Sequence, residues 1–226
     1  MDKKILILLP IWGRENIVKI CFDNLKELQK SYNIEVLCVV SEQWAKVMAF
    51  EYGFKYCNAS NDCLGTKMNI GIEHAKTMQF DYLMNLGSDD IITKDLFDAY
   101  EDCFNKNIGI FGATKATFID SESKEVKVFD YGVMIGAGRC IRKDILVENT
   151  KEGMYDKIQR GLDLNSMKRF IRVSNTEVQV PLTAIYDIKS KENIWKFNEL
   201  PKGETLDFDS ATKGLSTKQI DAILEL

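Results

Sequence analysis

Histidine, proline and closely paired cysteines are scarce in this 226-residue chain, and each scarcity excludes a class of protein. One histidine and six cysteines without C-x-x-C spacing exclude zinc-finger sites. Three prolines and the lack of low-complexity runs exclude Pro-rich linkers and repeat arrays. No apolar stretch approaches the ~20 residues of a membrane span, and Pro10 stops the first apolar run below signal-peptide length. We therefore expect no membrane span and a cytoplasmic location.

An excess of positive charge is also missing. The 30 Lys and Arg residues are outnumbered by 34 Asp and Glu residues, so the net charge is −4. Bulk charge therefore does not favour binding to nucleic acids or acidic membranes. The 45% hydrophobic and 28% charged content is typical of a globular domain. Most cysteines lie in apolar segments, which predicts buried free thiols and a reducing compartment.

Strands and helices alternate along the first 110 residues. Apolar runs predict strands over 5–9, 34–40, 54–57 and 82–86, and periodic patterns predict helices over 15–29, 42–52, 66–78 and 93–104. The connections are short, which indicates βαβ units on a parallel sheet. The fold class is therefore α/β.

The rear of the chain has a different pattern. A hairpin is expected around Ser121–Lys124, followed by a short strand over 133–135. Short helices should begin at Asp144 and Asp163, and 178–188 should be extended. The polar tail from residue 201 should end in a helix with Ser216 as its N-cap. These features predict a mixed, partly antiparallel second half.

The most informative motif is the end of the strand over 82–86. This strand leads directly to the adjacent carboxylates Asp89 and Asp90. In open α/β sheets, ligands bind beyond the carboxyl ends of the strands. Two carboxylates at that edge suit a hard divalent cation, which would bridge a diphosphate. The alternative is an ordinary turn, because Gly-Ser-Asp-Asp is also good turn chemistry.

A second motif opens the helix before that strand, where Gly65, Lys67, Asn69, Gly71 and Ala75 follow in order. Lys67 stands in the first helical turn, where free N–H groups and a cation can face a phosphate. Glycine within a helix indicates close packing or close approach at residue 71. The alternative is an ordinary surface helix.

These two motifs together resemble the GT-A fold glycosyltransferases, specifically the family 2-like inverting enzymes. The exit of the first strand, Leu8–Arg14, is similar to the segment that lies beside the donor nucleotide in that family. The segment Met134–Arg139 is similar to the glycine-containing loop on the acceptor side. Gly161-Leu162-Asp163 stands where the family places its catalytic base. The resemblance covers about residues 5–190.

The resemblance implies a single GT-A domain over 1–226, with a role for each part. Residues 1–112 would form the nucleotide-sugar-binding half, 113–200 the acceptor half, and 201–226 a tail with a helix. The implied activity transfers a sugar from a nucleotide-diphosphate sugar, with a UDP-sugar favoured, to an acceptor hydroxyl, with inversion. The donor-binding residues would be the following: Pro10, Trp12, Arg14, Ser41, Lys67, Asn69 and Asp89.

The resemblance also implies roles in metal binding and catalysis. Asp90, assisted by Asp89, would bind Mn²⁺ or Mg²⁺, and Asp187 is a candidate for the late third ligand. Asp163 would be the base, with Gly136, Gly138 and Arg139 on the acceptor side. Two alternatives remain for these residues. Asp163 can be a helix N-cap, and Asp187 can be a polar residue on an edge strand.

Some positions differ from the family pattern. Gly87 stands where the leading Asp of the Asp-x-Asp motif is expected, and Ser41 and Glu42 stand where an Asp reads the nucleobase. His74 is in a helix rather than late in the chain, and we expect it to be solvated. A catalytically degenerate scaffold and a sugar-nucleotidyltransferase therefore remain as alternatives. The single glycine after the first strand is unlike a nucleotidyltransferase loop.

The order of motifs also resembles compact glycosyltransferases encoded by bacteriophages, some of which modify hydroxymethylated bases in DNA. This implies DNA as one acceptor hypothesis and a bacterial or phage-infected host cytoplasm as the location. The basic groups available to hold a phosphate backbone are two clusters: Lys168, Arg169 and Arg172, and Arg139, Arg142 and Lys143. The alternative for both clusters is a solvated surface.

Overall fold

The computed structural model describes residues 2–200 and 203–226. For residues 172 and 174–177 it describes the backbone only. The strands are β1 Ile5–Pro10, β2 Ile34–Val40, β3 Lys55–Asn58, β4 Tyr82–Asn85, β5 Asp90–Ile92, β6 Ile110–Ala113, β7 Lys115–Asp120, β8 Val126–Asp130, β9 Cys140–Arg142, β10 Glu177–Val180, β11 Ile185–Lys189 and β12 Glu204–Leu206. The α-helices are α1 Glu15–Leu28, α2 Gln43–Glu51, α3 Leu64–Lys76, α4 Lys94–Asn105, α5 Lys143–Asn149, α6 Leu162–Met167, α7 Phe208–Ala211 and α8 Thr217–Leu224. Two 3₁₀ helices, Lys168–Thr176 and Phe197–Glu199, complete the described elements.

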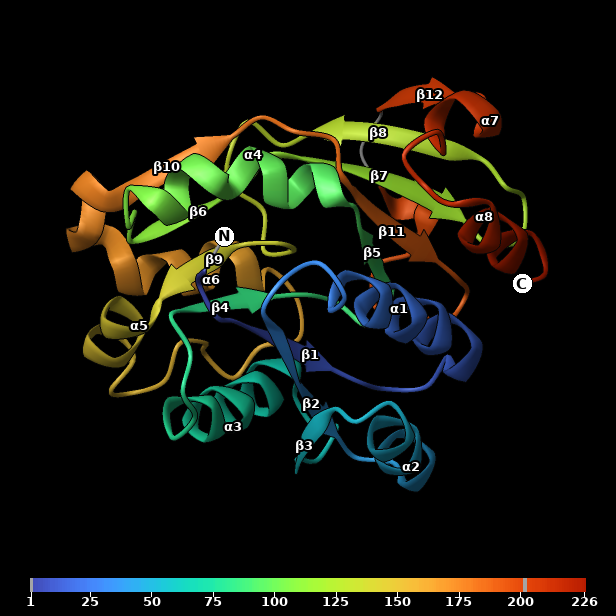
Figure 1. The fold of residues 1–226 in the computed structure, drawn as a ribbon. Helices are drawn as coiled ribbons and strands as arrows, with labels where there is room; N and C mark the ends of the chain where they lie inside the picture. The colour runs from blue at the N-terminus through green and yellow to red at the C-terminus, as the bar shows by residue number, and fades with distance from the viewer. Residues whose placement is uncertain (1, 201–202) are drawn as a thin grey trace.

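A seven-stranded sheet with the order β10-β6-β9-β4-β1-β2-β3 forms the centre of the molecule (Figure 1). Strands β1 to β4 are mutually parallel, as the βαβ pattern predicts, and β9 is antiparallel to β4 and β6. The strands β1, β2 and β4 are almost wholly buried because both faces of the sheet are covered there. One face packs against α1, α2 and α4, and the other packs against α3, α5 and Phe170.

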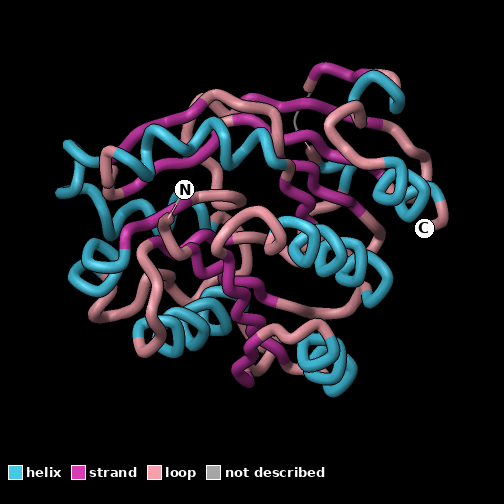
Figure 2. The backbone as a smooth tube through the Cα atoms, viewed as in Figure 1, coloured by secondary structure: helices cyan, strands magenta, loops and turns pink. Residues whose placement is uncertain are grey.

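A five-stranded sheet with the order β12-β8-β7-β11-β5 lies beside the first (Figure 2). Its pairs are antiparallel except for β7 with β11. The chain alternates between the two sheets, since β5 follows β4 and β7 follows β6. The boundary predicted at residue 112 falls inside β6, and the functional division into halves stays a prediction. Residues 201 and 202 of the predicted tail lie outside the described residues.

Helix α8 packs beside α1, near the C-terminus (Figure 1). Ser216 is its N-cap, as predicted, and forms a capping box with Gln219. Ile223 is fully buried in the cluster that joins this helix to the five-stranded sheet.

Most predicted elements are confirmed within a residue or two, and two are not. Residues 133–135 form no strand, because the chain turns there before the 136–139 loop, where Gly138 has φ +72°. The predicted extended segment 178–188 is divided into β10 and β11. Pro181 follows β10 and has no N–H for a ladder.

Close packing explains the glycine inside α3. A Cβ on Gly71 would lie 2.5 Å from Val39 Cγ2 and 2.8 Å from Leu8 Cδ1, so α3 lies directly on β1 and β2. All six cysteines are free and buried, as predicted. Among the described residues, no helix is long and apolar enough to span a membrane.

Candidate functional site

Three carboxylates meet where the two sheets join. Asp89 and Asp90 follow β4, and Asp187 lies on β11, directly opposite Asp90 in the antiparallel pairing with β5. One potential ligand atom from each carboxylate lies within 4.8 Å of the others. The predicted Asp89-Asp90 pair therefore lies beside the predicted third residue, although almost 100 residues separate them in the sequence. Such a set of oxygen ligands suits Mn²⁺ or Mg²⁺.

Each carboxylate is held by a donor from the chain. Asp89 Oδ2 accepts from Arg14 Nη1 at 2.7 Å and from Asn193 Nδ2 at 2.6 Å. Asp90 Oδ2 accepts from the Gly87 amide at 2.6 Å, and Asp187 Oδ2 accepts from Lys189 Nζ at 2.6 Å.

The other oxygen of Asp187 carries the clearest sign of a ligand. Asp187 Oδ1 is buried and has no hydrogen-bond partner within the described part of the chain. A buried carboxylate oxygen without a partner is costly. A bound cation would provide the missing partner, so the residues present fit a divalent metal.

The three carboxylates differ in their electrostatics. Burial, followed by the negative charges of Asp187 and Asp89, raises the pKa of Asp90 well above its usual range. Burial and Asp89 raise the pKa of Asp187 to about 6, against the opposing effect of Lys189. Burial alone would also raise the pKa of Asp89, but Arg14 and Lys189 outweigh it and lower that pKa. The raised pKa values of Asp90 and Asp187 reflect burial and neighbouring carboxylates, and a bound cation would favour the ionised form of both groups.

Gly87, which stands where the family pattern has an Asp, lies directly against the carboxylates of Asp89 and Asp90. A Cβ at this position would lie 2.7 Å from Asp89 Oδ1 and 2.8 Å from Asp90 Oδ2. The Gly87 amide instead holds Asp90. This departure from the family pattern thus leaves room for both carboxylates.

The exit of β1 reaches this site, as the sequence predicts. Pro10 ends β1, and Trp12 beyond it is 48% exposed. Gly13 and Arg14 both have positive φ, 54° and 56°, which turns the chain so that Arg14 meets Asp89. Arg14 thus neutralises a carboxylate of the site, and its contact with a donor stays a prediction.

Lys67 and Ser41 lie side by side beneath the same edge. Lys67 is 2% exposed, and its ammonium donates to the Ile11 carbonyl and to Asn61 Oδ1, at 2.5 Å to the latter. It also lies 3.4 Å from Ser41 Oγ. The Lys67 ammonium is therefore occupied by acceptors of the chain, and donor binding by Lys67 and Ser41 stays a prediction. The Lys67 side chain ties together the ends of β1 and β2.

The N-terminus of α3 is occupied by another segment of the chain. The Gly65 amide donates to the Ile158 carbonyl at 3.0 Å, and the Leu64 amide donates to Gln159 Oε1 at 2.8 Å. Asn69 Oδ1 accepts from the amides of Met154 and Tyr155. The predicted free N–H groups are therefore absent from this helix start, and Asn69 docks a loop in the observed structure.

Asp163, on α6, lies beside the 134–139 loop, which is the predicted acceptor-side loop. Its carboxylate lies directly against Gly136, where a Cβ would come within 2.0 Å of Oδ1. Asp163 is exposed in the first turn of α6, whose N-cap is Gly161, so the N-cap alternative for Asp163 is wrong. The Gly138 amide donates to the Asn85 carbonyl at the end of β4, which connects this loop to the carboxylate site.

Arg139 is buried beside the predicted acceptor-side loop. It is fully buried and donates to the carbonyls of Ile135, Met134 and Asp163 and to Ser166 Oγ. Its guanidinium thus holds α6 against the 134–139 loop. A role of Arg139 toward the acceptor stays a prediction.

Sequence reasoning assigned no role to Lys189 or Asn193. Lys189 has the same strand parity as Asp187, and period-two alternation places both on one face. This signal was available from the sequence. Asn193 reaches Asp89 through the turn after β11, and no sequence pattern indicates that contact.

This chain is similar to known proteins in structure rather than in sequence. No protein-family model matches the sequence, and no curated protein sequence matches it. Several solved structures do match it. S. aureus TarS 1-349 in complex with UDP has a TM-score of 0.60 at 14% identity, covering 99% of this chain and 72% of that one.

The fold is that of the GT-A nucleotide-sugar transferases. Glucosyl-3-phosphoglycerate synthase from Mycobacterium tuberculosis, solved with Mn²⁺, UDP and its glucosylated product, has a TM-score of 0.58 at 12% identity, covering 82% of this chain and 72% of that one. CMP:2-keto-3-deoxy-manno-octonic acid synthetase with CTP has a TM-score of 0.51 at 13% identity, covering 80% and 91%. The chain spans 60% of the length of one TarS 1-349 structure and 43% of a longer TarS structure.

Proposed function

We propose that this protein is a metal-dependent glycosyltransferase that moves a sugar from a nucleotide-diphosphate sugar to an acceptor hydroxyl with inversion. The observation that carries the proposal is the Asp89, Asp90 and Asp187 cluster at the carboxyl edge of the sheet, with Asp187 Oδ1 buried and unsatisfied within the described chain. UDP is the favoured nucleotide because it is present in solved structures of the same fold.

Each side chain around the carboxylate cluster has a proposed role in metal or donor binding. A bound Mn²⁺ or Mg²⁺ would supply charge neutralisation at the donor diphosphate. Asp90, Asp89 and Asp187 would hold that ion, while Arg14, Asn193 and Lys189 keep the carboxylates in place. Trp12, which is half exposed at the exit of β1, offers a stacking surface for the donor.

Asp163 is proposed as the general base. Its exposed carboxylate would take the proton of the acceptor hydroxyl, whose oxygen attacks the anomeric carbon while the bond to the diphosphate breaks. The position of Asp163 against Gly136, on the loop joined to β4, supports this assignment. Asp163→Asn should lower kcat by about 100-fold or more while the affinity for UDP changes little.

The two clusters considered for DNA are mostly committed elsewhere. Arg139 is buried, Arg142 pairs with Asp144, Lys143 donates to the Met78 carbonyl, and Arg169 pairs with Asp156. The side chain of Arg172 lies outside the described residues. These contacts therefore do not favour a DNA acceptor. The solved structures reported above do not support the bacteriophage resemblance.

The decisive test is thermal unfolding with nucleotides and metals. UDP at about 100 times its dissociation constant should stabilise the wild-type protein by ~2.7 kcal/mol in Mn²⁺, and chelator should abolish the effect. Asp90→Asn should lose this stabilisation, whereas Asp102→Asn, a change in an exposed pair on α4, should retain it. Lack of stabilisation by any nucleotide with Mn²⁺ or Mg²⁺ would favour the scaffold alternative.

A sugar-nucleotidyltransferase is the second candidate, since one structural match is a synthetase bound to CTP. The products distinguish the two reactions. A transferase releases a nucleoside diphosphate from a sugar nucleotide, whereas a nucleotidyltransferase releases pyrophosphate from a nucleoside triphosphate and a sugar substrate.

A further inference from the structure

A cavity of about 680 Å³ lies between the five-stranded sheet and the segment that contains β12 and α7. Its volume falls within the usual range for small-molecule sites. Its wall includes Thr117 of β7 and Tyr186 of β11, which are paired neighbours in the sheet. The cavity is separate from the carboxylate site, because Tyr186 and Asp187 are consecutive on β11 and therefore face opposite sides.

The wall contains a buried polar group without a partner. Thr117 is 1% exposed, and its Oγ1 has no hydrogen-bond partner among the residues that the structure describes. A hydroxyl both donates and accepts, and leaving it unsatisfied is unfavourable. A ligand that carries hydroxyl groups could provide both missing interactions.

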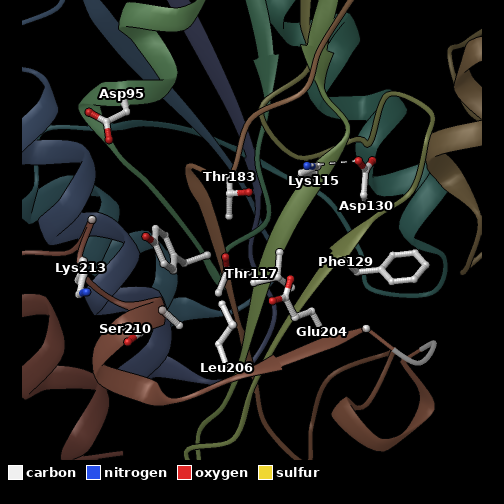
Figure 3. A pocket seen from close by; sticks show the side chains of 15 residues that line it. Asp95, Lys115, Thr117, Phe129, Asp130, Thr183, Glu204, Leu206, Ser210 and Lys213 are labelled. Atoms are coloured by element: carbon white, nitrogen blue, oxygen red, sulfur yellow. Dashed lines mark ion pairs between the residues drawn. The ribbon is translucent and has the colours of Figure 1, made fainter.

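Charges of both signs surround the cavity. Figure 3 shows Asp95 and Lys213 on one side and the Lys115–Asp130 pair, joined at 3.5 Å, on the other. Glu204 adds a third carboxylate, so acidic groups outnumber lysines. This balance disfavours phosphate and other anions, whereas carboxylates and ammonium groups together suit a neutral ligand with many hydroxyls.

Apolar surface completes the wall. Val128, Leu206 and Ala211 also line the cavity, together with Tyr186. Leu206 is labelled in Figure 3. A sugar ring matches this mixture, because it combines apolar C–H faces with hydroxyl groups at its edge. We propose that this cavity is a saccharide-binding site, distinct from the proposed donor and acceptor sites.

The test measures direct binding to the full chain, so its outcome is independent of the proposed transferase activity. The probes are glucose, galactose, mannose and N-acetylglucosamine. Their binding is measured by titration with saturation-transfer NMR, and we expect dissociation constants on the order of millimolar. Thr117→Val should weaken binding of the best sugar about tenfold, because it removes the hydroxyl and keeps a similar shape.

The matched control is Thr93→Val, which removes another buried hydroxyl without a described partner, outside the cavity wall. This variant should bind as the wild type does. Thermal unfolding should show that Thr117→Val is no less stable than the wild type, since an unsatisfied hydroxyl is lost.

Three results would overturn the proposal. The first is that no probe binds saturably, and the second is that Thr117→Val leaves sugar binding unchanged. The third is that Thr93→Val weakens sugar binding as much as Thr117→Val does. Asp163→Asn tests the location as well. If it abolishes sugar binding while Thr117→Val does not, the sugar binds at the proposed acceptor site instead.

Discussion

Gly87 is the residue on which the shape of the carboxylate site depends most directly. Its lack of a side chain lets its amide hold Asp90 at 2.6 Å. A Cβ would meet carboxylate oxygens of both Asp89 and Asp90. At this scale, the absence of one side chain leaves room for the carboxylates of Asp89 and Asp90 beside the Gly87 amide.

Gly87→Ala should therefore weaken Mn²⁺-dependent UDP binding about tenfold or more, because the added methyl displaces two carboxylates. The free energy of unfolding should change by about 1 kcal/mol or less, since the displaced groups are ends of side chains. Gly53→Ala is a control for which the opposite result is expected, namely a loss of stability without a loss of UDP binding. Gly53 has φ +67° and open space around it, so this variant should lose about 1–2 kcal/mol of stability and bind UDP normally. Isothermal titration and urea unfolding measure the two effects.

Lys67 makes the pH dependence of stability testable. Burial lowers its pKa from 10.5 to about 8, so the folded protein releases this proton at a lower pH than the unfolded chain does. The free energy of unfolding should therefore increase by on the order of 3 kcal/mol as the pH rises from about 8 to 10.5. Below pH 8, Lys67 should add no pH dependence to it.

The measurement is urea unfolding across that pH range for the wild type, Lys67→Met and the exposed control Lys151→Met. The contribution should disappear in Lys67→Met and persist in Lys151→Met. Thiols and phenols other than Cys57, whose pKa the charge of Lys67 lowers, cancel in the comparison, and a Cys57→Ala background removes that one difference. Parallel curves for the wild type and Lys67→Met would contradict the assignment.

At the scale of elements, α3 illustrates how packing overrides helix propensity. Gly71 costs the helix ~1 kcal/mol relative to Ala, yet it allows the helix to lie directly on β1 and β2. The same helix receives the 153–160 segment at its N-terminus, so both its face and its end are committed to structure.

Gly71→Ala should lower the free energy of unfolding by about 1–2 kcal/mol, because overpacking against Val39 and Leu8 outweighs the propensity gain. His74→Ala is the control on the exposed side of α3 and should have little effect. Urea denaturation checks both variants. A more stable Gly71→Ala protein would mean that α3 can move away from the sheet at little cost.

At the scale of the whole molecule, one apolar cluster connects the two sheets. It includes Ile5 and Leu9 of β1, Phe118 of β7, Ile185 of β11 and Leu200 near the end of the chain. Residues distant in sequence thus share one core, and β4 is paired with β9 as well as with β1.

The full chain should therefore unfold in a single calorimetric transition, with equal calorimetric and van't Hoff enthalpies. The fragment 1–112 should not fold alone, because it lacks β9 and the 116–200 part of the shared core. Two resolved transitions, or a fragment with a cooperative melt, would show that the halves are independent units.

The sequence by itself determined the parallel βαβ framework, because continuous apolar runs and helical periodicity are local patterns. It also determined that Asp89 and Asp90 follow a buried strand, since a strand delivers the residues after it to the edge of the sheet. Only the tertiary structure decided how side chains with similar chemistry are used. The sequence shows that Lys67 and Arg139 are basic residues, but only the structure shows that both are buried and donate to backbone carbonyls. The position of Asp187 opposite Asp90 depends on the register of β5 with β11, and the contact of Asn193 with Asp89 depends on the turn that follows β11; long-range contacts of this kind leave no local signal in the sequence.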